Sequence, residues 1–221
     1  MRAPIRSNRS RAVVRGLVLL AALTLCLMGA ANLTQGLAVP VKAHIGQTLL
    51  HREFEQRLAQ APKAEIAGSS VVASRSRKTA SPVSTARDTP YGALFARLTV
   101  VRLGVSEVVM TGDATDDRLD RGPVVIKRGD VASPITILAA HRDTHFAFIK
   151  DLREGDVVSL LSATGEVEQY RIVYLETVRW DRFSYPLNPA RPQLALATCY
   201  PFGGTEYGGP WRRVAWAERT V

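Results

Sequence analysis

The stretch PITILAAHRDTHF, residues 134–146, shows the pattern that decides the fold: a short apolar run that stops abruptly at polar residues. A second stretch, LALATCYPF at 194–202, ends in the same way. Short apolar runs bounded by turn residues are typical of β-strands. Further runs of this kind, separated by Gly, Asp and Pro, lie at 98–103, 107–110, 123–128, 156–161, 170–178 and 214–217. Residues 91–221 are therefore predicted to form an all-β domain, whose strand spacing suits a sandwich or a barrel.

Composition and charge narrow the class of protein. The chain has 221 residues, of which 46% are hydrophobic and 22% charged, so it can bury one core. This composition excludes a disordered or collagen-like chain. The formal net charge is +9, but the whole basic excess lies in the first 90 residues, and the domain from Tyr91 is formally neutral. A neutral domain argues against a nucleic-acid partner.

The N-terminal 40 residues have the features of a membrane anchor. Residues 16–31 are apolar or small, and no charge follows before Pro40. About 20 such residues span a bilayer as a helix. The charged residues before this stretch are Arg2, Arg6, Arg9, Arg11 and Arg15, which predicts a cytoplasmic N-terminus and an exported remainder. The small residues at 29–31 leave a cleaved signal peptide as the alternative. The length of the uncharged stretch favours an uncleaved transmembrane helix.

Two segments separate the anchor from the β domain. Over 41–60, apolar residues recur at helical spacing among charged ones, which indicates an amphipathic helix beside the membrane. These apolar residues are Ile45, Leu49, Leu50, Phe54 and Leu58. Residues 61–90 are rich in Ala, Ser, Thr and Arg and contain three prolines, so they are predicted to be a flexible linker.

The cysteine count singles out Cys199. The other cysteine, Cys26, lies inside the apolar anchor, so Cys199 has no disulfide partner. A free cysteine is either buried and inert or kept for its thiolate. Cys199 follows an apolar strand and precedes a Gly- and Pro-rich loop, and His141 follows another strand in the same way. Strand ends on one scaffold can hold a thiol beside its proton partner.

Three motifs resemble those of sortases, and more narrowly those of the sortases of Gram-negative bacteria. The motifs are an apolar strand leading into HRDTHF, then LATCYPF, then GGPWRR before a last strand. VKAHIGQTLL at 41–50 and DTP at 88–90 resemble the membrane-proximal region of that group. The resemblance implies a closed eight-stranded β-barrel with short helices, preceded by the transmembrane helix.

The resemblance also implies a membrane-anchored cysteine transpeptidase with His141, Cys199 and Arg212 as catalytic residues. Such an enzyme cleaves the C-terminal sorting signal of a substrate protein through a thioester and transfers the acyl group to an amine. It needs no cofactor, and its catalytic domain would lie in the periplasm, held by a single pass through the inner membrane. Arg213 stands where the family pattern has Tyr, and it would face the site in place of Arg212 if the strand register slipped by one.

Alternatives remain open from the residues alone. His141, His145 and Cys199 are possible zinc ligands, although Arg142 argues against the helical zinc motif. Asp143 is a candidate to orient His141 or to cap a turn. The function alternatives are a hydrolytic cysteine protease and a non-catalytic periplasmic barrel that binds a peptide or glycan, with Cys199 merely buried.

Overall fold

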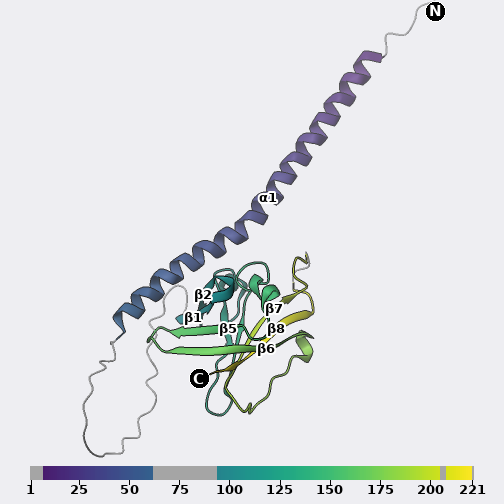
Figure 1. Cartoon of the computed structure of the whole chain (residues 1–221). Helices are drawn as coiled ribbons and strands as arrows, with labels where there is room; N and C mark the ends of the chain where they lie inside the picture. Colours follow the sequence, from purple (N-terminus) through teal and green to yellow (C-terminus); the bar gives the residue numbers. More distant parts are fainter. Residues whose placement is uncertain (1–6, 62–93, 205–207, 221) are drawn as a thin grey trace, which may run out of the picture. The chain divides into compact units, whose positions relative to one another are not determined.

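The computed structural model describes residues 7–61, 94–204 and 208–220 (Figure 1). It divides into two compact units, one up to Lys42 and one from Ala43 to the C-terminus. Apart from Ala61, the predicted linker over 61–90 lies outside the described residues. The DTP motif at 88–90 lies outside them as well.

The second unit contains a closed barrel of eight strands (Figure 1). The strands are β1 (Leu94–Val100), β2 (Val105–Met110), β3 (Val124–Lys127), β4 (Ile135–Ala139), β5 (Val157–Ser162), β6 (Val167–Arg179), β7 (Gln193–Tyr200) and β8 (Trp211–Arg219). Their order around the barrel is β1-β2-β3-β4-β7-β8-β6-β5, and β5 pairs back with β1. The pairs β2–β3 and β4–β7 are parallel, and the others are antiparallel. The predicted all-β barrel is therefore confirmed.

The helical elements are few and, after α1, short. They are α1 (Ser7–Gln60), α2 (Asp116–Leu119) and three 3₁₀ turns, η1 (Val101–Leu103), η2 (Ala147–Asp151) and η3 (Trp180–Arg182). Several strand ends differ from the predicted ranges, most of all the starts of β1, β6 and β8. β1 begins at Leu94 and gives way to η1 at Val101, whereas β8 begins at Trp211 rather than at 214. The earlier start of β8 has a physical reason, because Trp211 pairs with both β6 and β7.

The side chains of β4, β7 and β8 alternate between two apolar faces. One face belongs to the central core of the barrel, and its residues include Leu138, Leu194, Leu196 and Ala215. Seven of the eight strands contribute residues to this core, which therefore fills the barrel interior. The opposite, outer face forms a second core, made of Ile135, Ile137, Ala195, Val214 and Trp216. Phe183 and Tyr185, from the connection between β6 and β7, pack against this outer core. The outer face of these three strands is therefore covered in part by a loop.

The C-terminal part of α1 packs on the barrel. Leu50 and Phe54 are buried with Leu94, Val108 and Met110 in a third apolar cluster. Of the five apolar residues predicted to share a face, Ile45 and Leu49 are instead exposed, by 54% and 39%. The buried stripe consists of Ala43, Gly46, Gln47, Leu50 and Phe54, with Leu58 partly buried. Because this stripe includes a glutamine and a glycine, it does not follow the apolar periodicity from which a buried helix face is predicted.

The first unit contains the candidate anchor. Val13–Ala31 is a stretch of 19 residues within α1 that is long and apolar enough to cross a membrane. A signal sequence satisfies the same criterion, so the uncleaved anchor stays a prediction. The predicted boundary at Pro40 does not end a helix, since α1 continues through this proline to Gln60.

An ion pair at the start of β5 ties two connections together. Asp156 accepts hydrogen bonds from Arg102 Nε at 2.5 Å and Arg102 Nη2 at 2.6 Å, and from the Arg153 backbone N–H at 2.7 Å. The side chain of Asp156 is only 7% exposed. The hydrogen bonds from Arg102, followed by that from Arg153, lower the pKa of the Asp156 carboxyl from its usual value of 3.8.

This pair predicts a pH-dependent contribution to stability. At pH 7, Asp156→Asn is expected to lower the free energy of unfolding by about 1.5–3 kcal/mol, the usual worth of hydrogen bonds to a charged group. Because folding lowers the pKa of Asp156, its contribution is complete above about pH 3.8 and is lost as the pH falls through the folded value. Urea unfolding of wild type and variant, followed by tryptophan fluorescence, measures the difference. A difference that is unchanged at pH 2.5 would contradict this prediction.

Candidate active site

His141 and Cys199 come together because two parallel strands end at the same edge of the barrel. β4 and β7 are neighbours in register, with Ala139 beside Ala197. His141 and Cys199 each lie two residues beyond that pair, so alternation carries both onto the same outer face. The pairing of β4 with β7 thus brings His141 and Cys199 together although they are 58 positions apart in the sequence.

Arg212 joins them through the antiparallel pairing of β7 with β8. Cys199 pairs directly with Arg212, and Thr198 pairs with Arg213. Arg212 therefore lies on the same face of the sheet as Cys199. Arg213 lies on the opposite face, where its Nη1 donates to Thr177 Oγ1 at 3.3 Å. The one-residue slip that would exchange these two arginines is absent from the observed register.

The three side chains line a cavity of about 390 Å³. His141 is 20% exposed, and Cys199 is neither buried nor fully exposed. The apolar part of the wall is built by residues from several elements: Leu119, Ile126, Ile137, Trp180, Phe183 and Val214. This arrangement offers a thiol, an imidazole and a guanidinium at one end of an apolar hollow. It does not fit a Cys199 sealed in the core.

Buried polar contacts hold the two strand ends in place. Thr198 is 2% exposed, and its Oγ1 donates to the carbonyl oxygen of Ala140 at 2.7 Å. Arg142, which is 6% exposed, donates through Nη2 to the carbonyl oxygen of Gly204. The first contact joins the residue before Cys199 to the residue before His141. The second contact joins the loops that follow β4 and β7, so both reactive side chains stand on a fixed backbone.

Arg212 is oriented by its own loop. Its Nη1 donates to the carbonyl oxygens of Gly209 and Trp211, at 2.5 and 2.9 Å. A guanidinium carries five N–H donors in a planar fork, so a side chain held through Nη1 retains donors for an oxyanion. No such role follows from the position of Arg213.

Asp120 is a neighbour of His141 that the sequence did not single out. Its Oδ1 lies 3.4 Å from Nε2 of His141. Asp120 directly follows α2, in a stretch of acidic residues that resembles a solvated turn. Asp143, the carboxylate that the sequence suggested, contacts Nε of Arg142 at 3.4 Å, and its side chain is 61% exposed.

His145 does not join His141 and Cys199. It is 4% exposed, and its Nδ1 donates to Glu107 Oε2 at 2.9 Å, away from the residues that line the cavity. Within 7–61, 94–204 and 208–220, no group of three or more His, Cys, Asp or Glu side chains is placed to hold a metal ion. The zinc site suggested by these three residue types therefore lacks the required geometry.

Comparison with known proteins identifies the domain. The profile of the sortase domain matches residues 98–220, which are more than half of the chain and contain His141, Cys199 and Arg212. The chain is similar to Sortase D of Bacillus subtilis (strain 168), with 36% identity over 88 residues. That alignment covers 38% of this chain and 42% of Sortase D, so the chain matches less than half the length of this relative.

Solved structures agree with the fold. Sortase A from Corynebacterium diphtheriae matches with a TM-score of 0.51 at 18% identity, over 58% of this chain and 61% of that one. Sortase C of Clostridium perfringens, solved with the C-terminal cell wall sorting motif, matches with a TM-score of 0.51 at 21% identity, over 59% and 72%. A pilus-related sortase C of Group B Streptococcus matches with a TM-score of 0.51 at 19% identity, over 58% of this chain and 68% of that one. These likenesses show the fold alone, whereas the domain match over 98–220 shows that the chain belongs to the sortase family.

Proposed function

We propose that this protein is a membrane-anchored cysteine transpeptidase of the Gram-negative sortase type, in which Cys199 is the nucleophile. The observation that carries the proposal is the strand register, which sets Cys199 opposite Arg212 and brings His141 to the same cavity. A free thiol that lines an apolar cavity beside an imidazole and a guanidinium has the parts that acyl transfer requires.

The reaction follows from these three groups. Cys199 gives its thiol proton to His141, and its sulfur attacks the carbonyl carbon of the scissile peptide bond while Arg212 donates hydrogen bonds to the oxyanion that forms. The C–N bond then breaks as His141 gives a proton to the departing amine, leaving a thioester on Cys199. An acceptor amine attacks the thioester, loses a proton to His141 and takes the acyl group, which releases the thiolate.

The proposed substrate is a protein that carries a sorting signal near its C-terminus. The apolar wall of the cavity, with Trp180, Phe183 and Ile126, suits an apolar side chain of a bound peptide. The structure of Clostridium perfringens sortase C with its C-terminal cell wall sorting motif supports this class of substrate. A second partner is the amine acceptor, and thioester chemistry calls for no cofactor.

We place the catalytic domain in the periplasm, held to the inner membrane by one helix. Support comes from the apolar span Val13–Ala31 and from the arginines that precede it. The hydrolytic alternative differs only in the group that resolves the thioester, because water in place of an amine would make the enzyme a protease. Product analysis with and without an added amine separates the two activities.

Matched arginine variants test the proposal. Arg212→Ala is expected to lower kcat by about 10²–10³-fold, the usual cost of removing one oxyanion donor. Arg213→Ala, one residue along the same strand, is expected to stay within about twofold of wild type because its side chain lies on the other face. The assay follows cleavage of peptides that carry candidate sorting signals. Equal losses in both variants, or a larger loss in Arg213→Ala, would overturn the role assigned to Arg212.

A further inference from the structure

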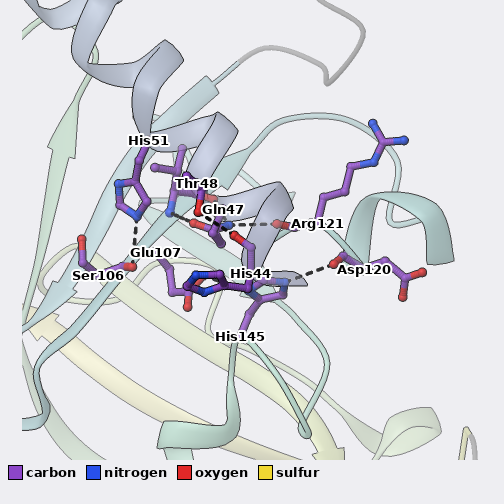
Figure 2. A network of polar contacts seen from close by, with 10 residues as sticks. His44, Gln47, Thr48, His51, Ser106, Glu107, Asp120, Arg121 and His145 are labelled. Carbon is purple, nitrogen blue, oxygen red and sulfur yellow. Dashed lines mark hydrogen bonds and ion pairs between the residues drawn. The ribbon is translucent and has the colours of Figure 1, made fainter. Parts of the chain in front are cut away.

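The backbone that carries Asp120 is fixed by a glutamine of α1 (Figure 2). Gln47 is 8% exposed, and its Nε2 donates to the carbonyl oxygen of Arg121 at 3.0 Å and to that of Val108 at 3.2 Å. Its Oε1 accepts from the Val108 backbone N–H at 2.7 Å. One side-chain amide therefore joins α1 to β2 and to the residue after Asp120.

Two glycines allow α1 to approach this closely. A Cβ on Gly46 would lie 3.0 Å from Cα and 3.1 Å from the carbonyl oxygen of Arg121, distances that real side chains rarely show. A Cβ on Gly122 would collide with Nε2 of Gln47. The helix is thus packed directly on the backbone of residues 121–122, with no side chain between them.

A buried histidine lies against the same turn (Figure 2). Nε2 of His145 lies 3.4 Å from the carbonyl oxygen of Asp120, while its Nδ1 is bound by Glu107. The backbone of the turn adds its own bond, from the Asp120 N–H to the Asp116 carbonyl oxygen at 2.8 Å. The position of Asp120 is therefore determined by α1, β2 and the loop after β4 together.

We propose that Asp120 is a positioning residue for His141, and that the docking of α1 through Gln47 fixes where Asp120 stands. This inference rests on the proposed function of His141. The carboxylate of Asp120 accepts hydrogen bonds only, so this contact holds the imidazole of His141 with its Nε2–H toward Asp120. The separation of 3.4 Å is long for a hydrogen bond, and catalytic contacts commonly shorten when the substrate binds.

Asp120 is better placed for this role than Asp143. Asp120 contacts the ring of His141 and stands on a turn with contacts on several sides. Asp143 is turned toward Arg142 and is mostly exposed. The part of α1 that follows the predicted membrane span therefore helps to position His141. It does so indirectly, because Gln47 contacts Arg121 and the neighbouring Asp120 contacts His141. The catalytic domain then extends back to Ala43 and does not begin at residue 91.

The first test compares Asp120→Ala with Asp120→Asn in the full-length chain in detergent. Asp120→Ala is expected to lower kcat by about tenfold or more with little change in KM, since supporting contacts typically carry this weight. Asp120→Asn is expected to recover much of that loss, because its amide oxygen still accepts from Nε2–H. The control is Asp113→Ala, an exposed carboxylate on the same connection. Wild-type kcat in Asp120→Ala would overturn the proposal.

A spectroscopic readout separates positioning from a structural effect. In the ¹⁵N spectrum of the His141 ring, the neutral wild-type imidazole is expected to carry its proton on Nε2. Asp120→Ala is expected to give a mixture of both tautomers. The same mixture in wild type and variant would overturn the proposal. The measurement does not depend on turnover, so it stands even if the chain is not a transpeptidase. Activity that persists in Cys199→Ala would instead refute the proposed function.

The helix part of the proposal has its own variants. Gln47→Ala and Gly46→Ala both disturb the contact with Arg121, one by removing the amide and one by adding a methyl group. Both are expected to lower kcat several-fold and to shift the His141 tautomer in the same direction that is expected for Asp120→Ala. Thr48→Ala is the control, because Thr48 is exposed and its hydroxyl donates to the carbonyl oxygen of His44 within the helix. Tryptophan fluorescence confirms folding at the assay temperature. Folded variants with unchanged kcat and His141 signals would overturn the role of α1.

Discussion

Replacing Cys199 by alanine is expected to remove acyl transfer while leaving the barrel folded. The sulfur lines the cavity and is the only candidate nucleophile that the strand register places beside both His141 and Arg212 among the described residues. Loss of a catalytic nucleophile typically costs about 10⁴-fold or more in kcat. Cleavage of a sorting-signal peptide, with and without an added amine, measures the loss.

The second cysteine supplies the control. Cys26 lies on the apolar helix, outside the barrel unit, so Cys26→Ala is expected to keep wild-type activity. A thiol-directed reagent should inactivate Cys26→Ala as fully as it inactivates wild type. Activity that survives in Cys199→Ala, or that is lost in Cys26→Ala, would show that the nucleophile is assigned to the wrong residue.

Replacing Phe54 by alanine is expected to lower the free energy of unfolding by about 3–5 kcal/mol, the usual cost of deleting a buried aromatic side chain. Phe54 is fully buried between α1 and the barrel, and the guanidinium of Arg97 stacks on its ring at 5.3 Å. Ile45→Ala is the matched control on the same helix, and its effect is expected to stay within about 0.5 kcal/mol because the side chain is exposed.

Denaturation of the full-length chain in detergent measures both variants. All three tryptophans, Trp180, Trp211 and Trp216, lie in the barrel unit, so their fluorescence reports its unfolding. Equal stability of Phe54→Ala and wild type would mean that α1 is not docked in solution. A fragment that starts at Tyr91 lacks both Leu50 and Phe54, and it is expected to be less stable than one that starts at Ala43.

The strands and the sides that they present could be predicted from the sequence because both depend on local patterns. Each apolar run became a strand, and alternation assigned Arg212 and Arg213 to opposite faces before any pairing was known. The ends of β4 and β7 also drew attention to His141 and Cys199, since an apolar strand that stops at a reactive residue is visible in the chain itself. The closed barrel, by contrast, came from resemblance to a family.

The contacts that the sequence did not reveal are those between elements far apart in the chain. In the sequence, Gln47 is a polar residue that interrupts an amphipathic helix. Its buried hydrogen bonds to the carbonyl oxygens of Val108 and Arg121 exist only because α1 packs against these residues. Asp120 reads as one more acid in a polar turn, and its distance from His141 depends on how that turn folds back. Tertiary contacts of this kind leave no periodic signal in a single sequence.

The most direct measurement is the intact mass of the full-length chain after incubation with peptides that carry candidate sorting signals, in the absence of an amine. The expected result is a mass increase equal to the N-terminal part of a cleaved peptide, located on Cys199, absent in Cys199→Ala and removed when an amine is added. Cleavage of the peptide with an adduct on another residue, or with no adduct under conditions that trap thioesters, would contradict the mechanism.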